Sequence, residues 1–218
     1  MKKKIFAIAS FIMILTLLVI NVEAKEIDNL RVVNISDDIK VIADIPEEYI
    51  NSVTEEELIN IAIENNLKNG ERIAVEKVGY IEEIGLQERA DWKITYPTRL
   101  TKSGSEYVKR DDFVISVARG EEKTLSKRFS ATVKSSISGS YYSLNSQLSS
   151  SLTATFEITQ KWKGPDSPYN STEYRVKFYA QKYNYEQDRC LDGYVSGTKK
   201  GTVIKPTRYL SYSIDRKV

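Results

Sequence analysis

Residues 129–159, FSATVKSSISGSYYSLNSQLSSSLTATFEIT, alternate between apolar and hydroxyl-bearing side chains over most of their length. A period of two residues is typical of a β-strand with one buried face and one solvent-exposed face. A polar turn at residues 143–146 divides the stretch into two runs. We therefore predict an antiparallel hairpin with about fifteen residues in each arm, although strands average only about five or six residues.

Shorter alternating runs continue this pattern on both sides of the hairpin. Predicted strands before it cover residues 71–84, 92–96 and 112–118, and those after it cover residues 174–185, 191–195, 202–204 and 207–214. Phe113, Ile115 and Val117 are expected to share one face, and residues 197–201 are expected to form a turn. Consecutive antiparallel strands with short turns predict a mainly β fold (α+β by count). This fold would be an antiparallel β-sandwich or an elongated twisted sheet, with one N-terminal helix.

The helix is predicted from its start and stop signals. Thr54 and Glu57 have the spacing of a capping box, and apolar residues at helical intervals follow them. Gly70 is the expected C-terminal stop. Residues 25–45 have no clear pattern, so we expect an extended, partly ordered arm there.

The N-terminus has the parts of a secretory signal peptide. Lys2–Lys4 precede a run of sixteen uncharged residues, and Val22 and Ala24 supply the small-x-small pattern of a cleavage site. This run is shorter than the ~20 apolar residues of a membrane-spanning helix. We expect cleavage after Ala24 and a secreted, extracellular protein. The single cysteine, Cys190, allows no internal disulfide, which for an exported chain is typical of a Gram-positive bacterium.

The predicted organisation has three parts: a signal peptide at 1–24, an acidic N-terminal arm plus helix at 25–70, and a β-rich domain at 71–218. Residues 25–100 carry 9 basic and 17 acidic side chains, a balance of −8, whereas residues 101–218 carry 20 and 12, a balance of +8. We hypothesise that the acidic part docks on the basic part as a removable cover. Raising the ionic strength should loosen such docking.

Several kinds of chemistry have no residues to support them. The chain contains no histidine, which excludes Ser-His-Asp and Cys-His catalysis and nearly every zinc site. It has no glycine-rich phosphate loop and no Ser-x-x-Lys acylase motif with its companion motifs. Four carboxylates beside predicted turns are interpreted as solvated charges: Asp111, Asp112, Glu121 and Glu122. We predict no enzyme activity, no catalytic or metal-ligating residue and no cofactor.

Tyrosines alternate with cations in residues 174–185 and again near residue 208. Exposed aromatic rings between cations stack on sugars or lie at a membrane interface. The candidate ligand face consists of Arg175, Lys177, Tyr179, Tyr183, Tyr185 and Arg208. Its expected partner is an anionic cell-wall polymer, a glycan or a lipid surface, and not a nucleic acid. The alternative is structural, since tyrosines also pair across strands alongside lysine stems.

The 129–159 hairpin resembles the insertion segment of aerolysin-type pore-forming toxins, the group that includes relatives of epsilon-toxin and mosquitocidal toxin. The resemblance is one of pattern and covers only these residues. It implies an elongated β-protein that is secreted as a soluble monomer and threads one hairpin per subunit into a membrane barrel. The candidate membrane-contacting residues are Phe129, Val133, Ile137, Leu148, Leu152 and Phe156.

The hairpin pattern also fits a simpler structure. Apolar-in, hydroxyl-out alternation is found in any two-faced strand pair of a secreted sandwich. The sequence leaves membrane contact and oligomeric state open. The first interpretation of the sequence is a secreted or cell-surface, non-enzymatic binding protein. The second is a membrane-active, pore-forming protein.

Overall fold

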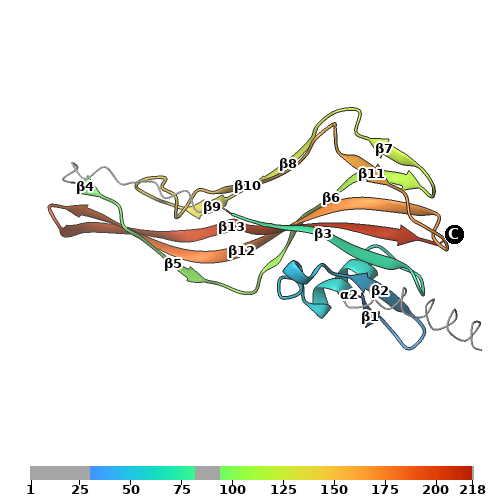
Figure 1. Ribbon diagram of the computed structural model, residues 1–218. Coiled ribbons are helices and arrows are strands. Elements are labelled where there is room, and N and C mark those ends of the chain that lie inside the picture. The colour runs from blue at the N-terminus through green and yellow to red at the C-terminus, as the bar shows by residue number, and fades with distance from the viewer. Residues whose placement is uncertain (1–29, 82–93, 218) are drawn as a thin grey trace, which may run out of the picture.

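The computed structural model describes residues 30–81 and 94–217. The predicted signal peptide, the end of the predicted strand at 71–84 and the start of the one at 92–96 lie outside these residues. The spine of the molecule is a long antiparallel hairpin of β12 (Ser171–Leu191) and β13 (Tyr194–Arg216), which runs almost its whole length (Figure 1). Strands of this length give the protein an elongated shape.

Shorter strands line both edges of this spine. The outer edge of β12 pairs with β6 (Tyr107–Ala118), β5 (Thr98–Lys102) and β4 (Ile94–Thr95), in this order toward the turn of the hairpin. The outer edge of β13 pairs with β3 (Arg72–Tyr80) and, nearer the turn, with β9 (Ser136–Gly139). β2 (Lys40–Asp44) joins β3 in parallel and pairs with β1 (Leu30–Asn34). The other pairings are antiparallel.

Two further layers cover the two faces of this sheet (Figure 1). On one face lie the small sheets formed by β8 (Phe129–Lys134) with β10 (Ser151–Phe156) and by β7 (Glu122–Thr124) with β11 (Lys161–Lys163). On the other lie α2 (Glu55–Glu64) and the short 3-10 helix η2 (Glu47–Tyr49), beside β1 and β2. We call residues 30–70, which contain these helices and strands, the N-terminal lobe.

Each layer has its own core. The N-terminal lobe packs Leu58 and Ile61 against Leu210, Tyr212 and Ile214 of β13. The small sheets pack against the opposite face, around Val176 and Phe178 of β12. A third, smaller core near the turn of the spine contains Leu148, Tyr185 and Val203. The central strands are therefore buried on both faces.

The predicted fold class is confirmed: in the part of the chain described, the protein is mainly β with one α-helix, and its sheet is elongated. The predicted helix start is confirmed, because the Thr54 hydroxyl accepts a hydrogen bond from the Glu57 backbone N–H at 3.2 Å. The capping box itself is incomplete, since the Glu57 carboxylate binds Arg208 and does not reach back to Thr54. The predicted helix stop is wrong. The helix ends at Glu64, and Asn66 takes the left-handed conformation (φ 52°) that asparagine tolerates.

Other local predictions also need correction. Residues 25–45 were expected to lack regular structure, but they contain β1 and β2, whose Val33, Val41 and Ala43 are buried in the lobe core. Phe113 is exposed rather than inward, because a bulge places Val114 between the paired residues Phe113 and Ile115 and reverses the alternation. The predicted turn at 197–201 is wrong, because these residues lie inside β13.

Candidate functional site

The β8–β10 hairpin is the element that the sequence singled out, and the structure resolves its two faces. The strands pair in register from Phe129 opposite Phe156 to Lys134 opposite Ser151. Their outer face is exposed and carries hydroxyl groups, with Thr132 and Thr153 hydrogen-bonded through their Oγ1 atoms at 2.8 Å. The outer face consists of Ser130, Thr132, Lys134, Ser151, Thr153 and Thr155. This surface is polar and nearly uncharged.

The inner face of the hairpin is apolar and closes over the spine. Its buried residues are Ala131, Val133, Leu152, Ala154 and Phe156, with Phe129 partly buried. Phe156 meets Trp162 edge-on with ring centroids 5.3 Å apart, and Trp162 meets Tyr174 in the same way at 4.6 Å. These rings join the hairpin to β11 and β12 by apolar contact.

The pairing of the hairpin is shorter than the predicted arms of about fifteen residues. β8 and β10 pair over six residues each. Beyond them, the Ser135 backbone N–H still donates to the Ser150 carbonyl (2.8 Å), but the Ser150 backbone N–H donates to the Ser135 hydroxyl (2.9 Å) in place of a backbone carbonyl. The first arm then turns to β13 as β9. Gly139 ends β9 at φ 112°, where a Cβ atom would lie 2.7 Å from the Gly201 Cα.

Among the side chains that hold the far end of the hairpin is one amide that the sequence did not single out. The Gln187 side chain is fully buried. Its Oε1 accepts hydrogen bonds from the backbone N–H groups of Tyr142 (2.6 Å) and Ser143 (2.9 Å), and its Nε2 donates to the Ser143 carbonyl at 2.7 Å. The membrane-contacting candidates near this end, Ile137 and Leu148, pack in the third core. The hairpin loop is therefore held against β12.

The six residues of the candidate ligand face do not form an exposed face. Lys177 has only 1% of its surface exposed, and Tyr179 and Tyr185 are also buried. Tyr183 is partly buried against the third core. Alternation in β12 predicted an outward row because a strand usually has one solvated face. Here that row lies under the N-terminal lobe and the third core, so the prediction of an exposed face is wrong.

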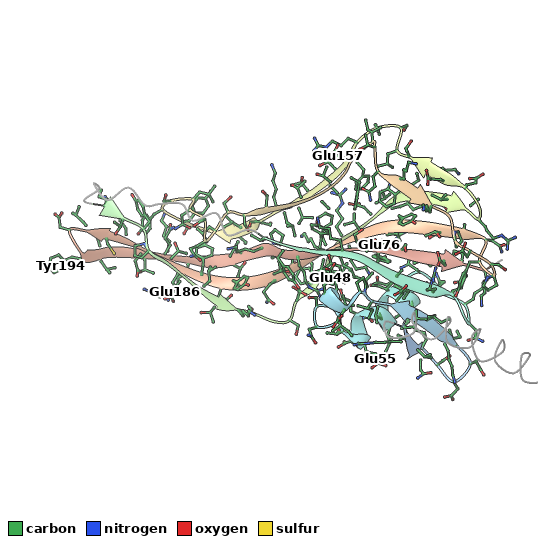
Figure 2. The ribbon with its side chains drawn as sticks, viewed as in Figure 1. Glu48, Glu55, Glu76, Glu157, Glu186 and Tyr194 are labelled. Atoms are coloured by element: carbon green, nitrogen blue, oxygen red, sulfur yellow. The ribbon has the colours of Figure 1, made fainter. Side chains whose placement is uncertain are left out.

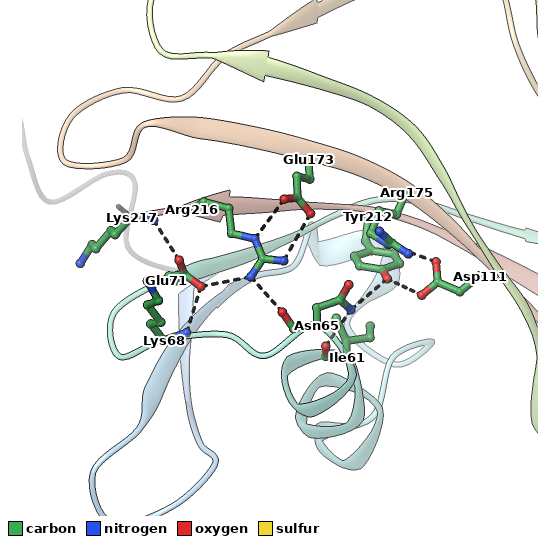
Figure 3. Close-up of polar contacts among 10 residues, drawn as sticks. All are labelled: Ile61, Asn65, Lys68, Glu71, Asp111, Glu173, Arg175, Tyr212, Arg216 and Lys217. Carbon is green, nitrogen blue, oxygen red and sulfur yellow. Dashed lines mark hydrogen bonds and ion pairs between the residues drawn. The ribbon is translucent and has the colours of Figure 1, made fainter.

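Two cations of this row, Arg175 and Lys177, form a polar cluster beneath α2 that is centred on Asp111. Figure 3 shows Arg175 and Tyr212 at the Asp111 carboxylate. The Asp111 carboxylate accepts hydrogen bonds from Tyr212 Oη (2.7 Å) and Arg175 Nε (3.3 Å). Lys177 Nζ lies 3.7 Å from Asp111 and forms an ion pair with Glu64 of α2. Burial, followed by the negative charge of Asp111, raises the pKa of Tyr212 above its usual value.

Arg208, the last of the six, is held by acidic groups from two directions. Its guanidinium donates to Glu57 of α2 at 3.1 Å, to Glu106 at 3.0 Å and to the Ser52 carbonyl at 3.0 Å. It also lies 4.2 Å from the centroid of the Tyr179 ring. Of these two acidic partners, Glu57 belongs to the lobe and Glu106 precedes β6, so the lobe supplies one part of the compensating charge and the sheet supplies the other.

The lobe is more firmly attached than the cover hypothesis requires. Arg216 near the C-terminus bonds to Glu71, to Glu173 and to the Asn65 carbonyl (Figure 3). β2 is hydrogen-bonded to β3, and the largest core lies between the lobe and the sheet. Because buried ion pairs are screened little by salt, ionic strength alone should not release the lobe. Its role as a removable cover stays a hypothesis.

The remaining carboxylates considered above are ion-paired: Asp112 with Arg110, Glu121 with Lys123, and Glu122 with Lys161. Burial raises the pKa of Tyr174 to about 12. Among the described residues, no group of three His, Cys, Asp or Glu side chains is placed to hold a metal ion. Within the same residues, no helix has the length and apolar character needed to cross a membrane.

The function of the site must therefore be argued from its geometry. Comparison of the chain with protein-family models, with curated proteins and with solved structures gave no match.

Proposed function

We propose that this is a secreted, membrane-active protein that forms pores by inserting its 129–156 hairpin into a lipid bilayer. The observation that carries the proposal is the construction of this hairpin. β8 and β10 form a two-stranded sheet of their own, with an apolar face buried on the spine and a hydroxyl-bearing face in water. A membrane-spanning strand needs the same alternation, with one face toward lipid and the other toward a water-filled lumen.

The length of the segment supports the same function. A tilted strand crosses the hydrocarbon layer with ~9–11 residues. If the loop at Tyr142 and Ser143 becomes the turn, the chain from Phe129 to Phe156 supplies more than this number of residues to each of the two strands. The strands would have to lengthen on insertion, with residues 136–139 pairing in the hairpin and no longer with β13.

The contacts that hold the hairpin would be exchanged rather than simply lost. Leaving the spine breaks the aromatic contact of Phe156 with Trp162, the Gln187 hydrogen bonds and the β9–β13 ladder. The apolar row would then be buried in lipid, which restores its removal from water. The core between the N-terminal lobe and β13 takes no part, so that half of the protein is expected to stay folded.

The alternative, a polymer- or glycan-binding protein, was based on residues that the structure shows to be buried or ion-paired. Lys177, Tyr179 and Tyr185 are buried, and Arg208 is paired with Glu57 and Glu106. A binding role therefore stays an untested expectation, and no described surface carries it.

Dye release from liposomes tests the proposed function directly. Residues 25–218, the chain expected after cleavage, would be added to neutral and anionic vesicles before and after limited proteolysis. We expect release under at least one of these conditions. If micromolar protein releases no dye from either kind of vesicle, with or without proteolysis, the pore-forming proposal is wrong.

Ion selectivity tests which face of the hairpin lines the pore. Thr155 is exposed on β10, so replacing it should change the unfolding free energy by no more than about 0.5 kcal/mol. In planar bilayers under a salt gradient, Thr155→Glu should shift the reversal potential toward cation selectivity and Thr155→Lys toward anion selectivity. The same replacements of Thr101, an exposed threonine on β5, should shift neither. Equal reversal potentials for all four variants would contradict the assignment of the lumen face.

A further inference from the structure

The turn of the β12–β13 spine forms a narrow, exposed tip at one end of the molecule. Asp192 and Gly193 make a two-residue turn with φ angles of +49° and +85°, and Leu191 pairs with Tyr194 behind it. Tyr194 is 81% exposed and Val195 is 59% exposed. Figure 2 shows Tyr194 at the extreme end of the long hairpin. We call residues 190–195 the apex.

The apex combines three exposed apolar side chains with one exposed carboxylate, Asp192, in the turn itself. Leu191, Tyr194 and Val195 all have large exposed side chains within five residues of chain. Among the described residues, β4 is the only strand alongside this two-stranded turn, where it pairs with Cys190 and Leu191. Such a projection suits contact with a surface rather than the enclosure of a small ligand.

A cation lies just behind the apex. Arg189 is exposed, and among the described residues its guanidinium has no acidic partner. It stands two residues behind Leu191, a distance of about 7 Å along a strand. The polar layer on each side of a bilayer is roughly 5–7 Å thick. An apolar tip in this layer would therefore place the arginine near the lipid phosphates.

The pore-forming hairpin points toward the same end of the molecule. Its loop is held by Gln187 of β12, which belongs to the fifth residue pair counted from the turn of the spine. The Tyr142 ring lies beside Lys199 of β13, whose Nζ is 4.5 Å from the ring centroid. Leu144 in the same loop is exposed. Contact between the apex and a membrane would bring this loop toward the bilayer.

We propose that the apex is the membrane-docking surface of the protein and that its partner is the headgroup layer of a lipid bilayer. Tyr194 lies at the interface, where tyrosine is favoured because its ring is apolar and its hydroxyl is polar. Leu191 and Val195 lie in the same headgroup layer beside it, and Arg189 binds lipid phosphate. This inference rests on the proposed function, for which it supplies the first step.

Vesicle co-sedimentation, measured separately from dye release, tests the docking step. The double variant Tyr194→Ser/Val195→Ser should reduce binding of residues 25–218 to vesicles at least about tenfold, since both replacements remove apolar surface that would be buried in the bilayer. The matched control is Tyr80→Ser/Val32→Ser, which removes the same residue types at sites that are 56% and 63% exposed in another part of the molecule. The control should bind as the unmodified chain does.

Arg189→Gln should lower binding to anionic vesicles more than binding to neutral ones, because it removes a charge that faces phosphate. Normal binding by the double apex variant overturns the inference and leaves the pore-forming proposal standing. If binding to vesicles depends on the apex but no dye is released, the docking inference is supported and the pore-forming proposal is wrong. Equal loss of binding in the apex variant and in the control contradicts the assignment of the surface to the apex.

Discussion

A disulfide between β9 and β13 is expected to abolish dye release. Ser138 and Thr202 are opposite each other in the antiparallel ladder, where Cα atoms lie about 4.5–5.5 Å apart, within the range of a disulfide. In a Cys190→Ser background, Ser138→Cys/Thr202→Cys should fasten the first arm of the hairpin to the spine. Oxidised protein should release essentially no dye, and a reductant should restore release to the level of the background protein.

A second disulfide separates detachment of the hairpin from opening of the hairpin. Thr132 and Thr153 are paired within β8–β10, and their hydroxyl oxygens are 2.8 Å apart. Thr132→Cys/Thr153→Cys joins the two arms to each other and leaves them free of the spine. This oxidised variant should still release dye, because the arms insert together. If both disulfides abolish release, the hairpin does not move as a unit. If neither does, it is not the inserting segment.

The sequence predicted the faces of this hairpin better than its pairing. The alternation of Ala131 and Val133 with Ser130 and Thr132 was enough to place the apolar row inward, because a period of two allows only one such arrangement. The length of the ladder was not predictable in the same way. It depends on the Ser135 hydroxyl taking the place of a backbone acceptor, which the alternation of residues does not express.

The longest hairpin in the protein was missed although its signal is present. Asp192-Gly193 is a typical two-residue turn with both φ angles positive, and the flanking residues alternate. We placed the turn at residues 197–201 because of Gly197 and Gly201. Both glycines instead lie in β13, where neighbouring side chains or backbone approach closely. A glycine within an alternating run therefore also marks a close approach of neighbouring chain, and not only a turn.

The candidate ligand face was wrongly predicted to be exposed because tertiary packing covers it. Arg175, Lys177 and Tyr179 alternate with apolar residues, which in an isolated sheet would put them in water. Their burial depends on the N-terminal lobe, whose strands β1 and β2 were not predicted. The acidic charge of that lobe was a partial signal, because Glu64 of α2 pairs with Lys177. The partner of Arg175 is Asp111 of β6, which lies in the basic half of the chain and which charge counting did not single out.

Replacing Asp111 should destabilise the protein more than any other single carboxylate substitution discussed above. Asp111→Ala leaves the Tyr212 hydroxyl without its acceptor, Arg175 without its partner and Lys177 with Glu64 alone. Because removing one member of a buried ionic cluster leaves charge uncompensated, the expected loss is about 3–5 kcal/mol of unfolding free energy. Urea denaturation followed by circular dichroism measures it.

Asp112→Ala is the matched control on the same strand. Its side chain is 18% exposed, against 19% for Asp111, but its ion pair is with Arg110, which is itself half-exposed. Such pairs contribute at most about 1 kcal/mol, so Asp112→Ala should cost far less than Asp111→Ala. Similar losses in the two variants would mean that the cluster beneath α2 adds nothing beyond an ordinary surface pair.

The shape of the Asp111→Ala unfolding curve also tests the hypothesis of a removable cover. Leu58 and Ile61 of the lobe share one core with Leu210 and Ile214 of the spine, so lobe and sheet should unfold together even when the polar cluster is weakened. We expect one transition with its midpoint shifted to lower urea. An additional early transition, accompanied by new proteolytic cleavage in residues 30–70, would instead mean that the ionic cluster is the main attachment. In that case the lobe would be a segment that a competing anion or a protease is able to displace from the spine.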